Sequence, residues 1–129
     1  MRIILLLALL ILGPSTSEAQ SNDVDLGPDS TGTNYWLIAG SVKQHEKYKF
    51  AWFRADASKD ATVSYRTSKF RIKFDCINER LGQTARVDYA PNGSVMNKFD
   101  TDYPQMTVAV PGSVGASWLN HVCAAYGKK

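Results

Sequence analysis

The stretch KFRIKFDC, residues 69–76, decides the fold of this chain. Apolar and charged side chains alternate along it, and a period of two is typical of a strand with one buried face. The buried face is predicted to carry Phe70, Ile72, Phe74 and Cys76. The opposite face is then a basic stripe, with cations about 7 Å apart, formed by Lys69, Arg71 and Lys73. The other predicted elements are arranged around this strand.

The N-terminus has the three parts of a Sec signal peptide. Arg2 precedes an unbroken apolar run over residues 3–12, and small residues end the segment at Ala19. As a helix the run is about 15 Å long, roughly half the core of a bilayer, so no membrane anchor is expected. We predict a signal peptide over residues 1–19, cleavage after Ala19, and export to the periplasm, the outer surface or the medium.

Cys76 and Cys123 are the only cysteines, so the exported chain has one available pairing. No Cys-x-x-Cys motif supports a redox role, and a structural disulfide across a loop of this length contributes roughly 4 kcal/mol. Cys123 lies in a predicted helix over residues 114–126, with Ser113 as N-cap and Gly127 as C′ residue. We expect the disulfide to join the apolar face of this helix to the apolar face of the strand.

The remaining segments favour further strands joined by short turns. Aromatic and β-branched runs predict strands over residues 35–39, 49–54, 84–89, 94–99 and 107–110, with a weaker one over 62–65. The dipeptide Asn92-Gly93 predicts a hairpin, since such a turn tolerates positive φ. The predicted fold class is α+β: an antiparallel meander of five or six strands, one C-terminal helix packed on one face, and one disulfide.

Residues 20–34 consist mostly of small and polar residues. They cannot bury enough surface to offset the entropy of ordering, so we predict a flexible leader before a domain over residues 35–129. Asp23, Asp25 and Asp29 form a small acidic cluster in this leader. Their spacing does not match a calcium loop, and no metal site is expected.

Several short motifs follow one another in a recognisable order. They are Tyr35-Trp36, Trp52-Phe53, Ser68-Lys69, Phe74-Asp75-Cys76, the Asn-Gly turn, Val110-Pro111-Gly112-Ser113, Leu119 and Val122-Cys123. This order resembles the surface-adhesin protein E family, small exported domains of Gram-negative bacteria. The resemblance implies an antiparallel sheet with a C-terminal helix. It also implies binding to host matrix and serum proteins, among them vitronectin, laminin and plasminogen, and the ability to form a homodimer.

The chain lacks the residue patterns that catalysis or cofactor binding requires. His45 lies in a polar stretch, residues 43–47, that predicts a solvated turn, and His121 falls beside the apolar face of the predicted helix. Asp100 and Asp102 leave a small hydrolase as a remote alternative. We expect no enzyme activity and no cofactor. A net charge of only +3, together with export, argues against a nucleic-acid partner.

The basic stripe is the most informative polar feature. One interpretation of such charges is solubility or protection of an edge strand. The alternative is a docking surface for acidic protein segments or acidic glycans. The C-terminal Lys129 offers an ammonium and a carboxylate together, and the family resemblance makes plasminogen a partner for it. The predicted binding residues are Lys69, Arg71, Lys73 and Lys129, with Cys76 and Cys123 structural.

Aromatic residues support an alternative function. The chain has more of them than one thin core requires, notably Trp36, Trp52, Phe53, Tyr65 and Tyr103. Some would then form an exposed patch for association. The alternative is a periplasmic structural subunit that assembles into an envelope complex through this patch.

Overall fold

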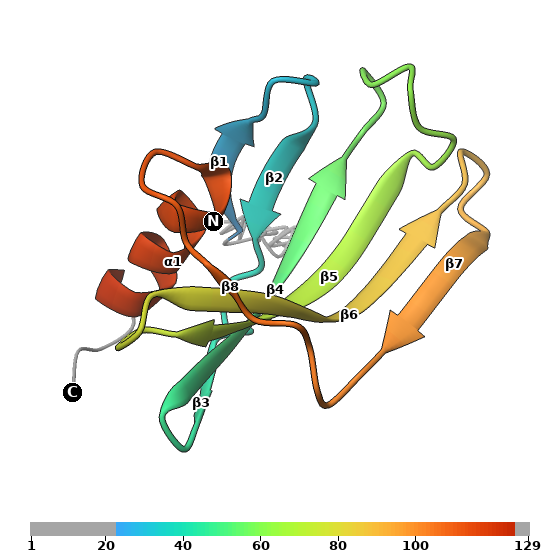
Figure 1. Ribbon diagram of the computed structural model, residues 1–129. Coiled ribbons are helices and arrows are strands. Elements are labelled where there is room, and N and C mark those ends of the chain that lie inside the picture. Colours follow the sequence, from blue (N-terminus) through green and yellow to red (C-terminus); the bar gives the residue numbers. More distant parts are fainter. Residues whose placement is uncertain (1–22, 126–129) are drawn as a thin grey trace, which may run out of the picture.

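In the computed structural model, one curved antiparallel sheet carries a helix, α1, on one face (Figure 1). The structure describes residues 23–125, so the predicted signal peptide and Lys129 lie outside it. The elements are β1 (Val24–Pro28), β2 (Asn34–Leu37), β3 (Lys43–His45), β4 (Tyr48–Asp56), β5 (Thr67–Asp75), β6 (Arg80–Tyr89), β7 (Val95–Asp100), β8 (Thr107–Val108) and α1 (Val114–Ala125). The predicted fold class is confirmed.

The strands form a meander, as the short turns predict. Neighbours pair in the order β1-β2-β4-β5-β6-β7, while β3 pairs with β4 and β8 with β6. Each of these pairings is antiparallel. The Asn92-Gly93 turn joins β6 to β7, with Gly93 at a φ of 86°. Over residues 23–125 the sheet has eight strands rather than five or six, mainly because two short ones, β1 and β3, were not predicted.

β1 lies in the segment predicted to be a flexible leader, and that prediction was wrong where β1 and β2 pair. Asp29 Oδ1 accepts hydrogen bonds from the N–H groups of Thr31 (2.9 Å) and Thr33 (3.2 Å), which holds the turn between the two strands. Val24 and Leu26 pack against the core. The average composition of residues 20–34 does not reveal these turn hydrogen bonds or this packing. One carboxylate that holds a turn and two apolar side chains that pack on the core are enough to add a hairpin to an existing sheet.

Two further segments differ from their predictions. Lys43–His45, expected in a solvated turn, forms the exposed strand β3 against β4. Residues 62–65, expected as a weak strand, lie in the irregular β4–β5 connection. There, Asp60 Oδ1 accepts a hydrogen bond from the N–H of Thr62 at 3.0 Å. Such local side-chain bonds compete with strand pairing.

The core lies between α1 and the facing sides of β2, β4 and β5. Phe53 and Phe74 are fully buried there, and α1 contributes Leu119 and Val122. Trp118 stacks on Phe53, with the ring centroids 5.0 Å apart. Burial of each large side chain contributes about 1.5–3 kcal/mol. The alternation predicted for the central strand is confirmed by the buried positions of Phe70, Ile72 and Phe74.

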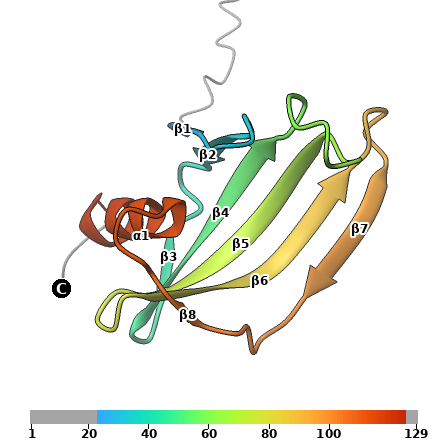
Figure 2. The same cartoon turned by 45° about the horizontal axis from the view of Figure 1, so that its top comes forward.

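Ser113 caps α1 as predicted. Its Oγ accepts a hydrogen bond from the N–H of Ala116 at 3.1 Å, which satisfies one of the helix's unpaired donors. The predicted C′ residue, Gly127, lies outside the described residues. Figure 2 shows α1 at one side of the curved sheet and β7 at the other. The helix therefore leaves the β7 edge uncovered.

Cys76 and Cys123 form the predicted disulfide, with their Cα atoms 5.8 Å apart. Cys76 follows the last residue of β5, so the bridge joins α1 to the β5–β6 turn and not to the apolar face of the strand itself. Asp75 holds this turn, because its carboxylate accepts hydrogen bonds from the backbone N–H (3.1 Å) and Nδ2 (2.9 Å) of Asn78. The disulfide thus ties the C-terminal half of α1 to one end of the sheet.

Candidate binding surface

The basic stripe lies on the outer face of the sheet, which we define as the face opposite α1. Because β5 directs Phe70 and its apolar neighbours toward the helix, Lys69, Arg71 and Lys73 project from the other side. Lys69 is exposed, whereas Arg71 and Lys73 are half-buried. The structure therefore brings together three of the four predicted binding residues. The fourth, Lys129, lies outside the described residues.

Neighbouring strands add more cations to this outer face. Residues directly opposite each other in paired strands share a face. Arg54 on β4 lies opposite Lys69, and Lys98 on β7 shares its face because Val87 lies opposite both lysines. On the other side, Phe50 lies between Lys43 and Lys73. The outer-face cations are therefore Lys43, Arg54, Lys69, Arg71, Lys73, Arg80 and Lys98.

Aromatic rings lie beneath several of these cations. The cation-to-centroid distances are 4.0 Å for Arg54 over Trp36, 4.0 Å for Lys73 over Tyr48, and 5.6 Å for Arg71 over Trp52. Each contact of this kind contributes about 0.5–1 kcal/mol at an exposed site. The rings also restrict the side chains above them. The outer face thus presents charged groups that are held in place by the aromatic rings beneath them.

Arg71 is the most firmly held of these cations. Its Nε donates a hydrogen bond to Oγ1 of the buried Thr84 at 2.8 Å. The pairing of β5 with β6 shifts register between Arg71 and Ile72, and Thr84 lies in this irregularity. A β-bulge of this kind commonly re-aims a side chain. The bulge therefore orients the guanidinium on the outer face.

Few carboxylates neutralise this surface. Asp23 Oδ2 lies 2.9 Å from Arg54 Nε, and Asp100 Oδ1 lies 3.6 Å from Arg71 Nη2. Within residues 23–125, no carboxylate forms an ion pair with Lys69. Lys69 also faces Arg54 directly across the strands, and like charges in opposite positions are unfavourable. An anion bound over this pair would relieve the repulsion.

Acidic residues bound this region at its β1 end. The hydrogen bond from Asn34 Nδ2 (3.0 Å), together with that from the N–H of Gly27, lowers the pKa of Asp25. The hydrogen bond from the backbone N–H of Ser58 (2.9 Å) lowers the pKa of Asp56 in the same way. Both carboxylates line a hollow of about 370 Å³ beside Trp36. The basic part of the outer face therefore extends from β3 and β4 toward β7.

The sequence patterns did not identify Arg54 and Lys98 as part of this basic surface. Period-two spacing within residues 49–54 does place Arg54 on the same face as Trp52. Spacing within one strand does not show which residue of the next strand lies opposite. Only the register sets Arg54 beside Lys69 and brings Lys98 into the same row.

The aromatic residues noted in the sequence occupy different places. Trp36 and Trp52 are half-buried on the outer face, while Phe53 belongs to the core. Tyr65 is half-buried, 5.3 Å from the Arg86 guanidinium, and Tyr103 is 92% exposed in the β7–β8 loop. They therefore form no single aromatic patch, and the outer face combines rings with cations instead.

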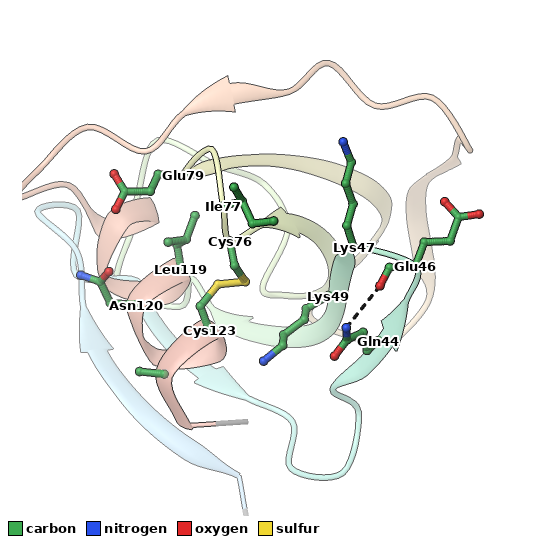
Figure 3. Close-up of a pocket in the computed structure, with 11 residues that line it drawn as sticks. Gln44, Glu46, Lys47, Lys49, Cys76, Ile77, Glu79, Leu119, Asn120 and Cys123 are labelled. Carbon is green, nitrogen blue, oxygen red and sulfur yellow. Dashed lines mark hydrogen bonds between the residues drawn. A yellow bond between two sulfur atoms is a disulfide. The ribbon is translucent and has the colours of Figure 1, made fainter. Parts of the chain in front are cut away.

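A groove of about 830 Å³ opens on the helix side, beside the disulfide (Figure 3). Leu119, Ile77 and the disulfide supply much of its apolar lining. Its charged lining residues are Glu46, Lys47, Lys49 and Glu79. Among the residues that the structure describes, the two lysines are balanced by two glutamates, so these charges do not favour an acidic ligand. The outer face, by contrast, has an excess of cations that favours an acidic ligand.

The residues considered for catalysis, His45, Asp100 and Asp102, lie in separate exposed places. The side chain of His45 is 78% exposed, with Nε2 4.0 Å from Glu46 Oε1. Asp100 contacts Arg71 on the outer face, and Asp102 is exposed in the following loop. In residues 23–125, no group of three or more His, Cys, Asp and Glu side chains could hold a metal ion.

Nearly all of the described chain matches one known protein family. Residues 24–124 match the family described as Surface-adhesin protein E. The chain belongs to the surface-adhesin protein E family. The resemblance inferred from the motifs of the sequence is therefore confirmed. No helix in the described part of the chain has the length and apolar composition needed to cross a membrane.

Solved structures of Haemophilus influenzae protein E share the fold of this family member. Crystal form II is 15% identical, with a TM-score of 0.60, and the match covers 91% of this chain and 98% of that one. A second structure is 17% identical, with a TM-score of 0.55 and coverages of 84% and 98%. Protein E from a non-typeable strain is 12% identical, with a TM-score of 0.55 and coverages of 90% and 84%. No curated protein sequence matches the chain. At these identities the likeness supports a common fold, not common ligands.

Proposed function

We propose that this protein is an exported, non-catalytic adhesin domain whose outer face binds acidic segments of host matrix or serum proteins, or acidic glycans. Membership of the surface-adhesin protein E family supports an adhesin that acts by binding. Vitronectin, laminin and plasminogen are the protein partners that the family implies. The proposed contact residues are Lys69, Arg71 and Lys73, with Lys129 added for partners that bind a C-terminal lysine.

One observation carries the proposal: cations from five neighbouring strands, β3, β4, β5, β6 and β7, share a face that α1 leaves uncovered. Aromatic rings hold several of them in place, and few carboxylates oppose them. Solubility alone requires dispersed charges of both signs. A concentrated and partly immobilised set of one sign favours a negatively charged partner.

The proposal is tested by measuring the affinity for a sulfated glycan of defined length. Lys69→Glu places a carboxylate at the exposed centre of the outer face. We expect the dissociation constant to rise about tenfold, because one attraction is replaced by a repulsion. Lys59→Glu is the matched control, since Lys59 is exposed in the turn after β4, where it lines the hollow at the acidic β1 end beyond the rows of outer-face cations. It makes the same change in net charge and should alter the affinity less than about twofold.

Salt provides the second part of this test. Contacts between exposed charges are screened over about 8 Å at physiological ionic strength. Binding should therefore weaken steeply as salt is raised from about 0.05 M to about 0.5 M. Equal losses in the two variants would contradict a binding site on the outer face. Association that survives high salt would favour the alternative, a structural subunit of an envelope complex.

A further inference from the structure

The side chain of Arg71 reaches across the outer face from β5 toward β7. Figure 2 shows β5, β6 and β7 side by side in the curved sheet. Arg71 lies opposite Ala85 on β6, and Ala85 lies opposite Asp100 on β7. Because the residue between them carries only a methyl group, Arg71 Nη2 approaches Asp100 Oδ1 to 3.6 Å. One carboxylate therefore lies against the outer end of the guanidinium.

A single hydroxyl group fixes this guanidinium. Thr84 is the extra residue of the bulge in β6, because the residues on either side of it pair with β5 and it does not. Its Oγ1 accepts a hydrogen bond from Arg71 Nε at 2.8 Å and donates one to the carbonyl oxygen of Arg71 at 3.2 Å. The hydroxyl of Thr84 thus restricts both the backbone and the side chain of Arg71.

The backbone of Thr84 also places Asp100. The N–H of Thr101 donates a hydrogen bond to the carbonyl oxygen of Thr84 at 2.8 Å. Asp100 precedes Thr101 and is the last residue of β7. Thr84 therefore holds the cation through its side chain and the carboxylate through its backbone, so the sheet itself sets the distance between them.

The contact between Arg71 and Asp100 is weak enough to exchange. At 3.6 Å it is longer than a hydrogen bond, and the side chain of Asp100 is 77% exposed. Ion pairs between exposed side chains contribute little to stability. Within residues 23–125, Nη1 and Nη2 of Arg71 donate no hydrogen bond to the protein. The planar end of the guanidinium, which suits two parallel contacts with an anionic group, is therefore available to a ligand.

The neighbouring charges indicate what kind of ligand takes the place of Asp100. Exchange of one anionic group for another gains little by itself, so the ligand has to contact other cations at the same time. Lys69 and Lys73 lie on either side of Arg71 along β5, each about 7 Å away. A chain that carries several anionic groups meets this requirement, whereas a single small anion does not.

The outer face favours a glycan over a peptide as this chain. The backbone N–H and C=O groups of β4, β5 and β6 pair with one another within the sheet. The face therefore offers an extended peptide none of the backbone partners that the edge of a sheet would offer. A sulfated glycan has no peptide backbone to satisfy, and its anionic oxygens accept hydrogen bonds from a guanidinium.

We propose that Arg71 is the anchor of the outer face for a sulfate group of a linear sulfated glycan, and that Asp100 occupies this anchor until the ligand displaces it. The inference rests on the proposed binding function and adds a defined subsite to it. Thr84 is the positioning residue of this subsite, and Asp100 is its internal competitor. Removal of Asp100 therefore strengthens binding, whereas removal of an outer-face cation weakens it.

Titration with a sulfated glycan tests the competitor. Asp100→Asn should lower the dissociation constant about three- to fivefold, the size expected for an exposed ion pair. Asp102→Asn is the matched control, since Asp102 is exposed in the following loop and forms no ion pair within residues 23–125. It makes the same change in net charge and should alter the affinity less than about twofold. In an Arg71→Gln background the two aspartate variants should behave alike, because Asp100 then has no guanidinium to occupy.

Two variants of Thr84 test the positioning. Thr84→Ser keeps the hydroxyl and should bind the glycan within about twofold of the parent. Thr84→Val keeps the shape but removes both hydrogen bonds to Arg71, so the dissociation constant should rise about threefold. Circular dichroism checks that both variants are folded. Equal affinities of the two variants would contradict a positioning role for Thr84.

Inorganic sulfate tests the anchor without the glycan. The side-chain Nε–H signal of Arg71 in the nuclear magnetic resonance spectrum follows occupancy of the anchor at constant ionic strength. Asp100→Asn should lower the dissociation constant for sulfate about three- to fivefold, and Asp102→Asn should leave it within about twofold. This measurement separates the anchor from the proposed function, which fails if the parent protein binds no glycan.

Three results would overturn the inference. Equal effects of Asp100→Asn and Asp102→Asn, on either sulfate or the glycan, would show that Asp100 does not occupy a ligand site. Weaker glycan binding by Asp100→Asn would show that the carboxylate supports binding and does not compete with it. Polyglutamate that binds as tightly as a glycan of equal charge would overturn the choice of a glycan.

Discussion

The two faces of the sheet are built by the same strands, yet they differ in almost every physical property. On the helix side, β4 and β5 present Phe53, Phe70 and Phe74, which α1 covers and removes from water. On the outer face, the intervening residues are rings under cations, such as Trp52 beneath Arg71. One alternating sequence thus buries one face of the sheet in the core and leaves the other face charged and accessible to water. Changes on the two faces should therefore have different consequences.

The largest difference is expected between two phenylalanines of β4. Phe53 is fully buried, so Phe53→Ala should lower the free energy of unfolding by about 3–5 kcal/mol through lost burial and a cavity. Phe50 is half-buried on the outer face, and Phe50→Ala should cost only about 1–2 kcal/mol. Chemical denaturation of both variants measures the difference. Equal losses would show that the outer face is also part of the core.

Removal of the disulfide should have the next largest effect. The double variant Cys76→Ser/Cys123→Ser frees the C-terminal half of α1 from the β5–β6 turn. The free energy of unfolding should fall by roughly 2–4 kcal/mol, which lowers Tm by roughly 10–25 °C. Glycan binding below the new Tm should persist, because the bridge lies on the helix side. A change in Tm under about 2 °C would contradict a structural role for the bridge.

The smallest effect concerns pH. The hydrogen bond from the Asn78 side chain lowers the pKa of the buried Asp75 below its ordinary value of 3.8, and the backbone N–H of Asn78 adds to this. The folded state then binds this proton less readily than the unfolded state. The stabilisation is therefore complete well above pH 3.8 and is lost as the pH falls below it.

Asp75→Asn removes this ionisation and tests the link. At about pH 6 the variant should lower the free energy of unfolding by about 1 kcal/mol, and at about pH 3 by less. Denaturation at the two pH values measures the change. A cost that is independent of pH would show that the ionised carboxylate is not what stabilises the β5–β6 turn.

Local patterns in the sequence predicted those parts of the fold that depend on near neighbours. The alternation in residues 69–76 assigned both faces of β5, Ser113 marked the start of α1, and the Asn92-Gly93 turn marked the β6–β7 hairpin. β1 was not predictable in the same way. The formation of β1 depends on the turn that Asp29 holds and on packing against a sheet built from residues much later in the chain.

The candidate binding surface was predictable to the same extent. Period-two spacing identified Lys69, Arg71 and Lys73 as one stripe, since that relation lies within a single strand. Arg54 and Lys98 join this stripe only through strand pairing. The number of residues that separate them from the stripe in the sequence does not show which residues pair. The β7 edge is likewise an edge only because no other described strand reaches it.

The sequence by itself determined the two-sided character of β5, the helix that covers one side, the single disulfide pairing and the family. Only the tertiary structure decided which cations lie together, where the disulfide attaches, and which edge of the sheet stays open. The physical reason is range: side-chain periodicity and capping act over a few residues, whereas register and coverage depend on which distant segments pair.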